Sequence, residues 1–310
     1  MKIKTRLFLT IIFMLWASNP PISAESETHK EKAEGSVNIL IVDGFNNHDW
    51  KATTKALKSI LSKNKSFHII VSTIPDENSN EWKKWSPNFS DYDTIIQNTN
   101  NISNKGAWPQ HAQRNLEKYI TTGGSMFVMH SGNNAFKEWP EYNKMIGLGW
   151  RNKNFGPSIR IDEGIPTIIP KGEGLNTGHG KRVDALVTRL GEHPIHAGLP
   201  RSWMAADTEV YWYPRGPAEN ITILSYAQER KTKLNFPTEW VVNYGKGKVY
   251  CSTFGHFWHN EKQIPRGIQC VAFQTSLIRS LLWLSNQEIK PETPESFPTK
   301  DSVSLINFEK

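Results

Sequence analysis

The fold is decided by the stretch Gly123-Gly-Ser-Met-Phe-Val-Met-His-Ser-Gly132. Its two leading glycines end a helical pattern whose apolar stripe includes Leu116 and Ile120. The apolar run that follows is typical of a strand buried on both faces. His130 comes directly after this run, at the kind of sharp strand-to-helix turn that can present a reactive side chain. The stretch therefore predicts a central parallel strand that ends in a histidine.

Strand and helix patterns alternate on both sides of this stretch. Upstream, apolar runs predict strands at 37–42, 67–73 and 92–97, with helices near 50–61 and after Trp108-Pro109. Downstream, we expect extended segments at 158–161, 183–188, 209–213, 221–226, 238–242 and 248–254, and a closing helix at 267–284. Gly245-Lys-Gly247 predicts a hairpin turn between the last two strands. This rhythm is typical of an α/β protein with a doubly wound parallel sheet, in which ligands bind beyond the carboxyl ends of the strands.

The N-terminus has the layout of a secretory signal peptide. Lys2, Lys4 and Arg6 precede an apolar run at 7–17, and 22–24 resembles a small-residue cleavage site. An uncleaved anchor is the alternative. We therefore expect a signal peptide at 1–24, a polar linker at 25–36, a folded domain at 37–286 and a loosely ordered tail at 287–310. The predicted location is secreted or periplasmic, with no membrane span after cleavage.

Charge and cysteine content narrow the possible functions. Three of the 37 basic residues lie in the predicted signal peptide, which leaves 34 basic against 30 acidic residues. This excess is too small and too evenly spread to indicate nucleic-acid binding. Cys251 and Cys270 are predicted to be buried free thiols rather than a disulfide.

The residues at two strand ends argue against glutaminase chemistry and against a nicotinamide-dependent step. Val128-Met-His-Ser-Gly132 contains no cysteine, so the thiolate attack that a glutaminase needs at this turn is absent. After the first strand, Gly44-Phe-Asn-Asn-His48 stands in place of a glycine-rich dinucleotide fingerprint. We therefore expect neither glutaminase activity nor a nicotinamide-dependent step within this chain.

Short motifs along the chain resemble one known family. They are Gly123 to Asn134, Met145 to Arg151, Gly178 to Gly180, His193 to Pro200, Thr208 to Tyr211, Arg215 to Asn220, Tyr244 to Tyr250, and Thr253 to His256. In order and spacing they resemble the ThuA-like (trehalose-utilisation) family of the class I glutamine amidotransferase-like superfamily, from about Val37 to Asn286. Two positions depart from the family pattern, since Thr208 stands where it has Asp and Lys248 where it has Arg.

The resemblance implies a flavodoxin-like, doubly wound, mostly parallel sheet with additional strands over 37–286. It also implies a link to sugar catabolism, often beside oxidoreductases that make 3-keto-glycosides. A small carbohydrate is therefore the expected ligand, and a sugar oxidoreductase is an expected functional companion.

His130, Glu209 and His256 are the candidate catalytic residues. An imidazole at the end of the central strand, as at His130, can transfer a proton near neutral pH or bind a metal. Glu209 begins an alternating segment that would put Tyr211 on the same face. His256 follows the strand that ends at Gly255. The alternatives are a histidine that only stabilises a turn and an exposed charge, and His196 in particular is expected to be structural.

Polar side chains at the other expected strand ends and loops are the candidate substrate-binding groups. They are Asp43, Asn46, His48, Asn98, Asn100, Ser131, Arg151, His179 and Tyr211. Asx residues also build turns without a ligand, so a structural role is the alternative at several of these positions. Trp108 and Trp150 are candidates for an aromatic wall.

The sequence requires no cofactor, but it leaves a divalent metal such as zinc open. His130, His179, Glu209 and His256 are ligand types that zinc accepts. They are far apart in the chain, so only the fold can bring them together.

These features favour a carbohydrate-active protein that acts on a glycoside or 3-keto-glycoside by histidine and glutamate acid-base chemistry. His130 would be the base, with Glu209 or His256 as the acid. The alternatives are a non-catalytic sugar-binding module and a metal-dependent hydrolase. The proposed mechanism requires that His130, Glu209 and His256 converge in one crevice.

Overall fold

The computed structural model describes residues 35–102 and 106–306. The predicted signal peptide and most of the predicted linker lie outside these residues. Within them, no helix is long and apolar enough to cross a membrane.

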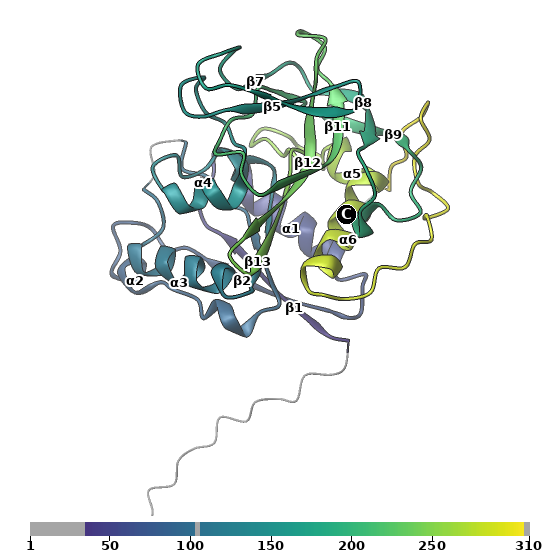
Figure 1. Ribbon diagram of the computed structural model, residues 1–310. Coiled ribbons are helices and arrows are strands. Elements are labelled where there is room, and N and C mark those ends of the chain that lie inside the picture. The colour runs from purple at the N-terminus through teal and green to yellow at the C-terminus, as the bar shows by residue number, and fades with distance from the viewer. Residues whose placement is uncertain (1–34, 103–105, 307–310) are drawn as a thin grey trace, which may run out of the picture. The chain divides into compact units, whose positions relative to one another are not determined.

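The central sheet begins with parallel strands in the order β2-β1-β3-β4-β13. These strands are β1 (Val37–Asp43), β2 (Phe67–Thr73), β3 (Thr94–Gln97), β4 (Ser125–Val128) and β13 (Gly247–Ser252). This is the strand order of the flavodoxin-like doubly wound fold. The predicted fold class is therefore confirmed (Figure 1), and β4, which ends two residues before His130, lies between β3 and β13.

An antiparallel extension continues the sheet beyond β13 in the order β12-β11-β8-β9. The strands of this extension are β12 (Asn235–Tyr244), β11 (Ile221–Gln228), β8 (Val183–Arg189) and β9 (Ser202–Thr208). β5 (Ser158–Asp162) pairs with β12, and β6 (Ile165–Ile169) pairs with β5. β7 (Gly178–His179) and β10 (Tyr211–Trp212) form a separate two-stranded sheet. The predicted hairpin is present, since Tyr244 pairs with Gly247 across its turn. These are the additional strands that the resemblance implied.

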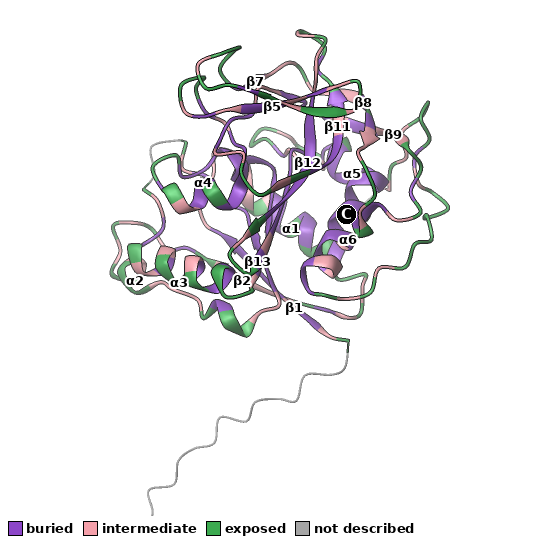
Figure 2. Cartoon of the chain, viewed as in Figure 1, coloured by how far each residue is buried: buried purple, intermediate pink, exposed green. Residues whose placement is uncertain are grey.

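Helices cover both faces of the parallel strands. The helical elements are α1 (Trp50–Leu61), α2 (Asn80–Lys84), α3 (Gln110–Thr121), α4 (Pro140–Ile146), α5 (Arg266–Gln269) and α6 (Val271–Leu284), with 3-10 turns η1 (Phe89–Asp91), η2 (His130–Asn134) and η3 (Pro194–His196). Along β1, Ile39 and Ile41 pack with α1 and α6, whereas Leu40 and Val42 pack with α3 and α4. The alternating side chains of one strand thus build two cores, and Figure 2 shows the buried strands between partly exposed helices.

Three expectations about elements were wrong. The segment 209–213 is not one strand, because β9 ends at Thr208 and Asp207 has a φ of 50°, which leaves Glu209 in the connection to β10. The closing helix is broken at Cys270, whose ψ of 124° is extended. The part of the C-terminal tail that the structure describes, residues 287–306, is held in place by hydrogen bonds and is not loose.

Hydrogen bonds to backbone carbonyl oxygens hold the tail along the antiparallel edge and the closing helices. Met204 N donates to Thr299 O (2.8 Å) and Val271 N donates to Ser304 O (3.0 Å). Arg279 Nη2 donates to Glu292 O (2.9 Å). The tail therefore covers β9, which would otherwise be an open sheet edge. Cys251 and Cys270 are both free and buried, as predicted.

A buried ion pair links η3 to β12. His196 Nε2 lies 3.2 Å from Glu239 Oε2, with both side chains at most 1% exposed. Burial acts to raise the pKa of Glu239, but His196 and the hydroxyls of Ser225 and Tyr250 outweigh it and lower that pKa to about 2. This placement agrees with the structural role expected for His196.

Replacing Glu239 with Ala leaves His196 buried without its partner, and we expect a loss of about 3–5 kcal/mol in unfolding free energy at neutral pH. The folded pKa of Glu239 lies below its ordinary value of 4.5, so its contribution is present above that pH and is lost as the pH falls toward 2. Urea unfolding of both proteins at neutral and at acidic pH measures this. A difference that does not shrink on acidification would contradict the assignment.

Candidate active site

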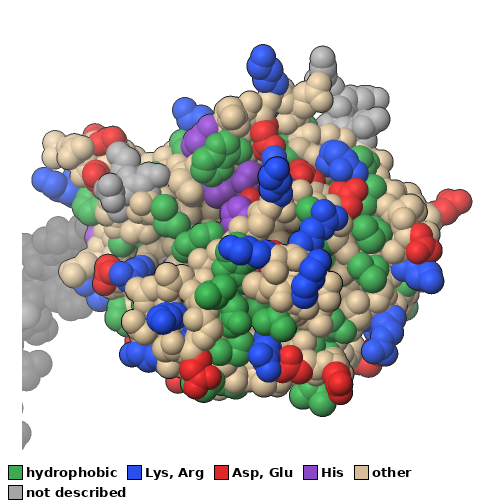
Figure 3. Space-filling model, turned by 90° about the horizontal axis from the view of Figure 1, so that it is seen from above, with side chains coloured by type: hydrophobic (Ala, Val, Ile, Leu, Met, Phe, Trp, Pro, Cys, Tyr) green, Lys and Arg blue, Asp and Glu red, His purple; other side chains and the backbone are tan. Residues whose placement is uncertain are grey.

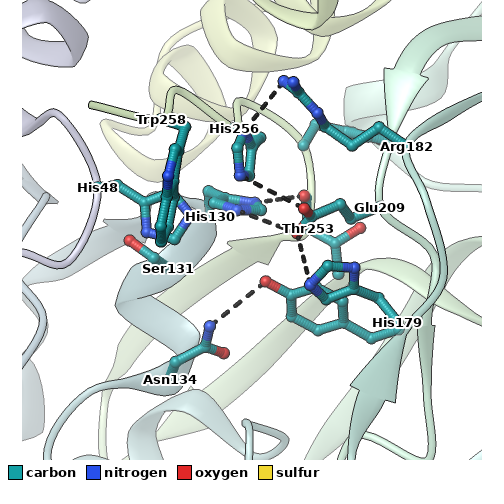
Figure 4. A network of polar contacts seen from close by, with 12 residues as sticks. His48, His130, Ser131, Asn134, His179, Arg182, Glu209, Thr253, His256 and Trp258 are labelled. Atoms are coloured by element: carbon teal, nitrogen blue, oxygen red, sulfur yellow. Dashed lines mark hydrogen bonds and ion pairs between the residues drawn. The ribbon is translucent and has the colours of Figure 1, made fainter. Parts of the chain in front are cut away.

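The candidate site lies where the loops after β1, β4 and β13 meet the connection between β9 and β10. His48 follows β1, His130 opens η2 directly after β4, and His256 follows β13. Because β1, β4 and β13 are parallel, their carboxyl ends share one edge of the sheet. Glu209 reaches the same edge from the antiparallel extension. The predicted convergence of His130, Glu209 and His256 is therefore present (Figure 4).

His130 is held in a strained turn. Its φ is 35°, a left-handed conformation that a residue with a side chain seldom adopts. Asn133 Nδ2 stabilises the turn by donating to His130 O (2.9 Å) and to Ser252 O (2.8 Å). His130 is 2% exposed, and its Nδ1 lies 2.6 Å from Thr253 O. The turn thus points the imidazole at the end of β13.

The carboxyl group of Glu209 lies against the imidazoles of His130, His179 and His256. Its Oε2 is 3.6 Å from His130 Nε2 and 3.6 Å from His179 Nε2. Its Oε1 is 3.4 Å from His256 Nε2. Figure 4 shows these rings pointing toward the carboxyl group from different elements.

Hydrogen bonds fix the tautomers of His130 and His179. Each Nδ1 lies 2.6 Å from a backbone carbonyl oxygen, of Thr253 and of Gly180 respectively. A carbonyl oxygen only accepts, so in the neutral rings both Nδ1 atoms carry the hydrogen and both Nε2 atoms present a lone pair. These lone pairs face Glu209 Oε2, so a positively charged species or a proton belongs between them. Burial raises the pKa of Glu209 to about 7, although Arg182 opposes the rise.

Burial disfavours charge on the surrounding imidazoles. It lowers the pKa of His130 to about 4 and, with the neighbouring His130, lowers the pKa of His48 to about 2. Burial and the same neighbour also lower the pKa of His256. Neutral imidazoles are good metal ligands and proton acceptors, so the cluster is set up for either chemistry.

A cleft of about 440 Å³ opens onto this cluster, and its lining includes Glu209, His48, His179 and His256, but not His130. Trp150 lies beside His179 and Tyr211, with ring centroids 5.4 and 5.3 Å away. Trp258, which is 39% exposed, lies 4.8 Å from His48 and stacks on His256 at 5.9 Å. Figure 3 shows the histidines gathered on this face beside hydrophobic side chains. The cleft therefore offers flat aromatic surfaces above polar groups.

A larger groove of about 770 Å³ runs beside β5, β6 and β11. Its lining, which includes Ile159, Ile168 and Ile221, holds no titratable side chain. It offers no group for acid-base chemistry or for binding a metal.

Several predicted binding residues lie behind the cleft and position the groups that line it. Asn46 Oδ1 accepts from Ser131 Oγ (3.0 Å) and from His48 N (3.0 Å). Asn100 Nδ2 donates to Ser131 O (2.8 Å). These contacts tie the loop after β1 to η2 and so fix the position of His48.

Asp43 and Asn98 do not reach the cleft. Asp43 accepts from Thr54 Oγ1 and Thr73 Oγ1, both at 2.7 Å. Asn98 Nδ2 donates to Trp50 O and to Thr54 Oγ1, both at 3.2 Å. Both side chains therefore anchor α1 and do not contact a ligand in the cleft.

Arg151 is a buried structural group. Its guanidinium donates to Asn143 Oδ1 and to the carbonyl oxygens of Asn134, Ala135 and Trp150, at 2.6–3.0 Å. Burial lowers its pKa to about 10. The side chain closes the end of η2 and has no donor left for a ligand. Trp108, proposed for the aromatic wall, is 1% exposed and lies in the core.

Sequence reasoning missed Trp258, Arg182 and Asn134, which all line the cleft. Arg182 Nη1 donates to His256 Nδ1 (3.1 Å) and to Asp207 Oδ2 (3.1 Å). Asn134 Nδ2 lies 3.4 Å from the hydroxyl of Tyr211. Nearness to motif histidines was the available signal, since Trp258 follows His256 by two positions and Arg182 follows His179 by three.

Comparison with known proteins finds one family and a set of similar structures. The family model ThuA, described as trehalose utilisation, matches residues 38–265. A ThuA-like protein from Parabacteroides merdae has 28% sequence identity and a TM-score of 0.80, over 87% of this chain and 98% of that one. One from Bacteroides uniformis has 16% identity and a TM-score of 0.51, over 80% and 91%. A search of curated proteins found no match.

Replacing Arg151 with Lys removes most of the hydrogen bonds that its guanidinium makes at the end of η2, because a lysine ammonium cannot reproduce the planar set of guanidinium donors. We expect a loss of about 2–4 kcal/mol in unfolding free energy, measured by urea denaturation. Arg160→Lys is the control, because Arg160 pairs with Asp162 at the surface and should change stability by under about 0.5 kcal/mol. Equal stability of the two variants would refute the structural role of Arg151.

Proposed function

We propose that this chain, which belongs to the ThuA (trehalose utilisation) family, is a carbohydrate-active enzyme. Its reaction is a proton transfer on a glycoside or 3-keto-glycoside, carried out by Glu209 and the imidazoles around it. The observation that carries this proposal is the Glu209 carboxyl, 3.4–3.6 Å from His130, His179 and His256 at the bottom of an aromatic-walled cleft.

The geometry favours Glu209 over His130 as the group that meets the substrate. His130 lies outside the lining of the cleft, whereas Glu209 and His256 are part of it. A substrate that enters the cleft therefore reaches the carboxyl group first. His130 acts from behind, as a partner that orients Glu209.

A 3-keto-glycoside fits this arrangement because its ketone acidifies the neighbouring C2–H bond. Glu209 takes the C2 proton, and the C–H electron pair moves onto the C3 oxygen as an enolate. When that pair returns, it expels the glycosidic oxygen from C1, and this oxygen takes a proton from the cluster. The products are an unsaturated keto sugar and a free alcohol, and addition of water to the new double bond completes a hydrolysis.

The ketone has to be made elsewhere, because the loop after β1 carries no dinucleotide fingerprint. A sugar oxidoreductase is therefore the proposed companion. The signal peptide at 1–24 stays a prediction, and with it a secreted or periplasmic site of action.

Replacing Glu209 with Gln keeps the shape of the site but removes the group that carries the proton. We expect kcat on a 3-keto disaccharide to fall roughly 10²–10⁴-fold with substrate binding retained. Product analysis by chromatography and binding by calorimetry measure the two effects.

Glu138→Gln is the control, because its side chain is 88% exposed outside the cleft. Turnover by Glu209→Gln equal to that of this control would rule out the assignment. Sugar binding by the wild type without any product would instead identify a non-catalytic binding module.

Replacing Trp258 with Ala removes the exposed aromatic surface over His48 and His256. We expect KM for the sugar to rise about tenfold, equivalent to ~1.4 kcal/mol, with kcat little changed. Trp258→Phe keeps an aromatic surface and should retain most of the affinity. If the Ala variant lowers kcat and leaves KM unchanged, Trp258 is not a binding platform.

A further inference from the structure

His48, His130 and His256 form a compact group of imidazoles beside Glu209. Each offers a ring nitrogen that lies within 4.8 Å of the nitrogens offered by the other two. Their ring centroids are 4.7–5.2 Å apart and the rings are close to perpendicular, at 78–81°. Nitrogens bound to one zinc ion stand roughly 3.3 Å apart, given bonds of about 2.0–2.1 Å, so ring movements of about 1 Å close the group around an ion.

The nitrogen of His130 that faces this group is unsatisfied. His130 Nε2 is fully buried and has no hydrogen-bond partner among the described residues. A buried lone pair without a partner is costly, and its presence calls for a ligand or a function. A cation bound at this position would satisfy it.

The opposite ring nitrogens of His130 and His48 are held as metal-bound histidines require. His130 Nδ1 donates to Thr253 O (2.6 Å) and His48 Nδ1 donates to Asn47 Oδ1 (3.0 Å). Such bonds fix the ring orientation and leave Nε2 free to bind. His256 differs, because its Nδ1 accepts from Arg182 Nη1 (3.1 Å) and the neutral ring then carries its hydrogen on Nε2. Ligation through Nε2 moves this hydrogen to Nδ1, so Arg182 has to turn away, and Glu261 Oε2, 4.0 Å from Nδ1, is the acceptor nearby. Arg182 keeps its carboxylate partners Asp207 and Glu261.

We propose that His48, His130 and His256 bind one divalent transition-metal ion of the zinc class. Imidazole ligands suit zinc, cobalt, nickel and iron and disfavour magnesium and calcium. Three protein ligands leave a coordination position open for substrate or water, which is the arrangement of a catalytic site rather than a structural one. The open position faces the cleft, because His48 and His256 line it. Glu209 stands beside the ion as the proton-carrying group.

This inference rests on the proposed function and adds a cofactor to it. The ion would polarise the carbonyl or hydroxyl oxygen of a sugar in the cleft while Glu209 moves the proton. It also explains the cluster electrostatically, because a cation offsets the repulsion between the Glu209 carboxylate and the lone pairs of neighbouring imidazoles. His179 stays outside the ligand set, at 3.6 Å from Glu209.

The test is the binding of Co²⁺ to the full chain after chelation and removal of the chelator. We expect one Co²⁺ per chain, the visible d–d absorption of a site with imidazole ligands, and a rise in Tm with Co²⁺ concentration. His48→Ala and His256→Ala should each weaken Co²⁺ binding by more than the roughly 10–100-fold typical of changes outside the ligand set. His259→Ala is the matched control and should bind as the wild type does.

Each result decides the metal site separately from the enzyme function. Absence of Co²⁺ absorption and of a Tm shift in the wild type would overturn the metal site, whatever the activity. Equal binding by His48→Ala, His256→Ala and the wild type would overturn the ligand assignment. Glu209→Gln should still bind Co²⁺ but lose turnover. If it binds Co²⁺ and keeps full turnover, the role given to Glu209 fails while the metal site stands.

Discussion

The buried contact between the Glu209 carboxyl and the lone pairs of neighbouring imidazoles is the constraint on which the site depends. The backbone carbonyls of Thr253 and Gly180 hold the hydrogens of His130 and His179 on Nδ1, away from Glu209. A negative carboxylate facing these nitrogens in an enclosed site would be costly. The arrangement is stable only when a proton or a cation lies between the carboxyl oxygens and the ring nitrogens. Either of the two can take part in a reaction.

The fold supplies this constraint from its topology. Parallel order puts the ends of β1, β4 and β13 at one edge, which gathers His48, His130 and His256. The antiparallel extension returns the chain to that edge and adds Glu209 and His179 from the β9–β10 connection and β7. Polar groups outside the cleft, such as the buried Arg151 and the partly buried Asn46, hold the loops in place. The doubly wound half thus contributes His48, His130 and His256, and the added strands contribute Glu209 and His179.

The sequence was sufficient to predict the parallel half and the histidines that converge at its edge. Runs such as 37–42 and the turn at His130 carry strong local signals, and strand ends in a parallel sheet must meet. Local pattern could not place Glu209 in a break between strands, because that break depends on the left-handed backbone of Asp207. The local sequence pattern also could not distinguish Arg151, which donates to backbone carbonyl oxygens, from an arginine that binds a ligand. Trp258 and Arg182 carry no pattern of their own beyond their nearness to His256 and His179, and tertiary contacts put them in the cleft.

The most direct measurement of proton transfer is hydrogen exchange on a 3-keto sugar in D₂O, followed by NMR at the carbon next to the ketone. If Glu209 removes that proton, the wild-type protein will exchange it much faster than buffer does, and Glu209→Gln will exchange it at close to the rate in buffer. Equal rates for the wild type and for buffer, or for the wild type and Glu209→Gln, would contradict the account.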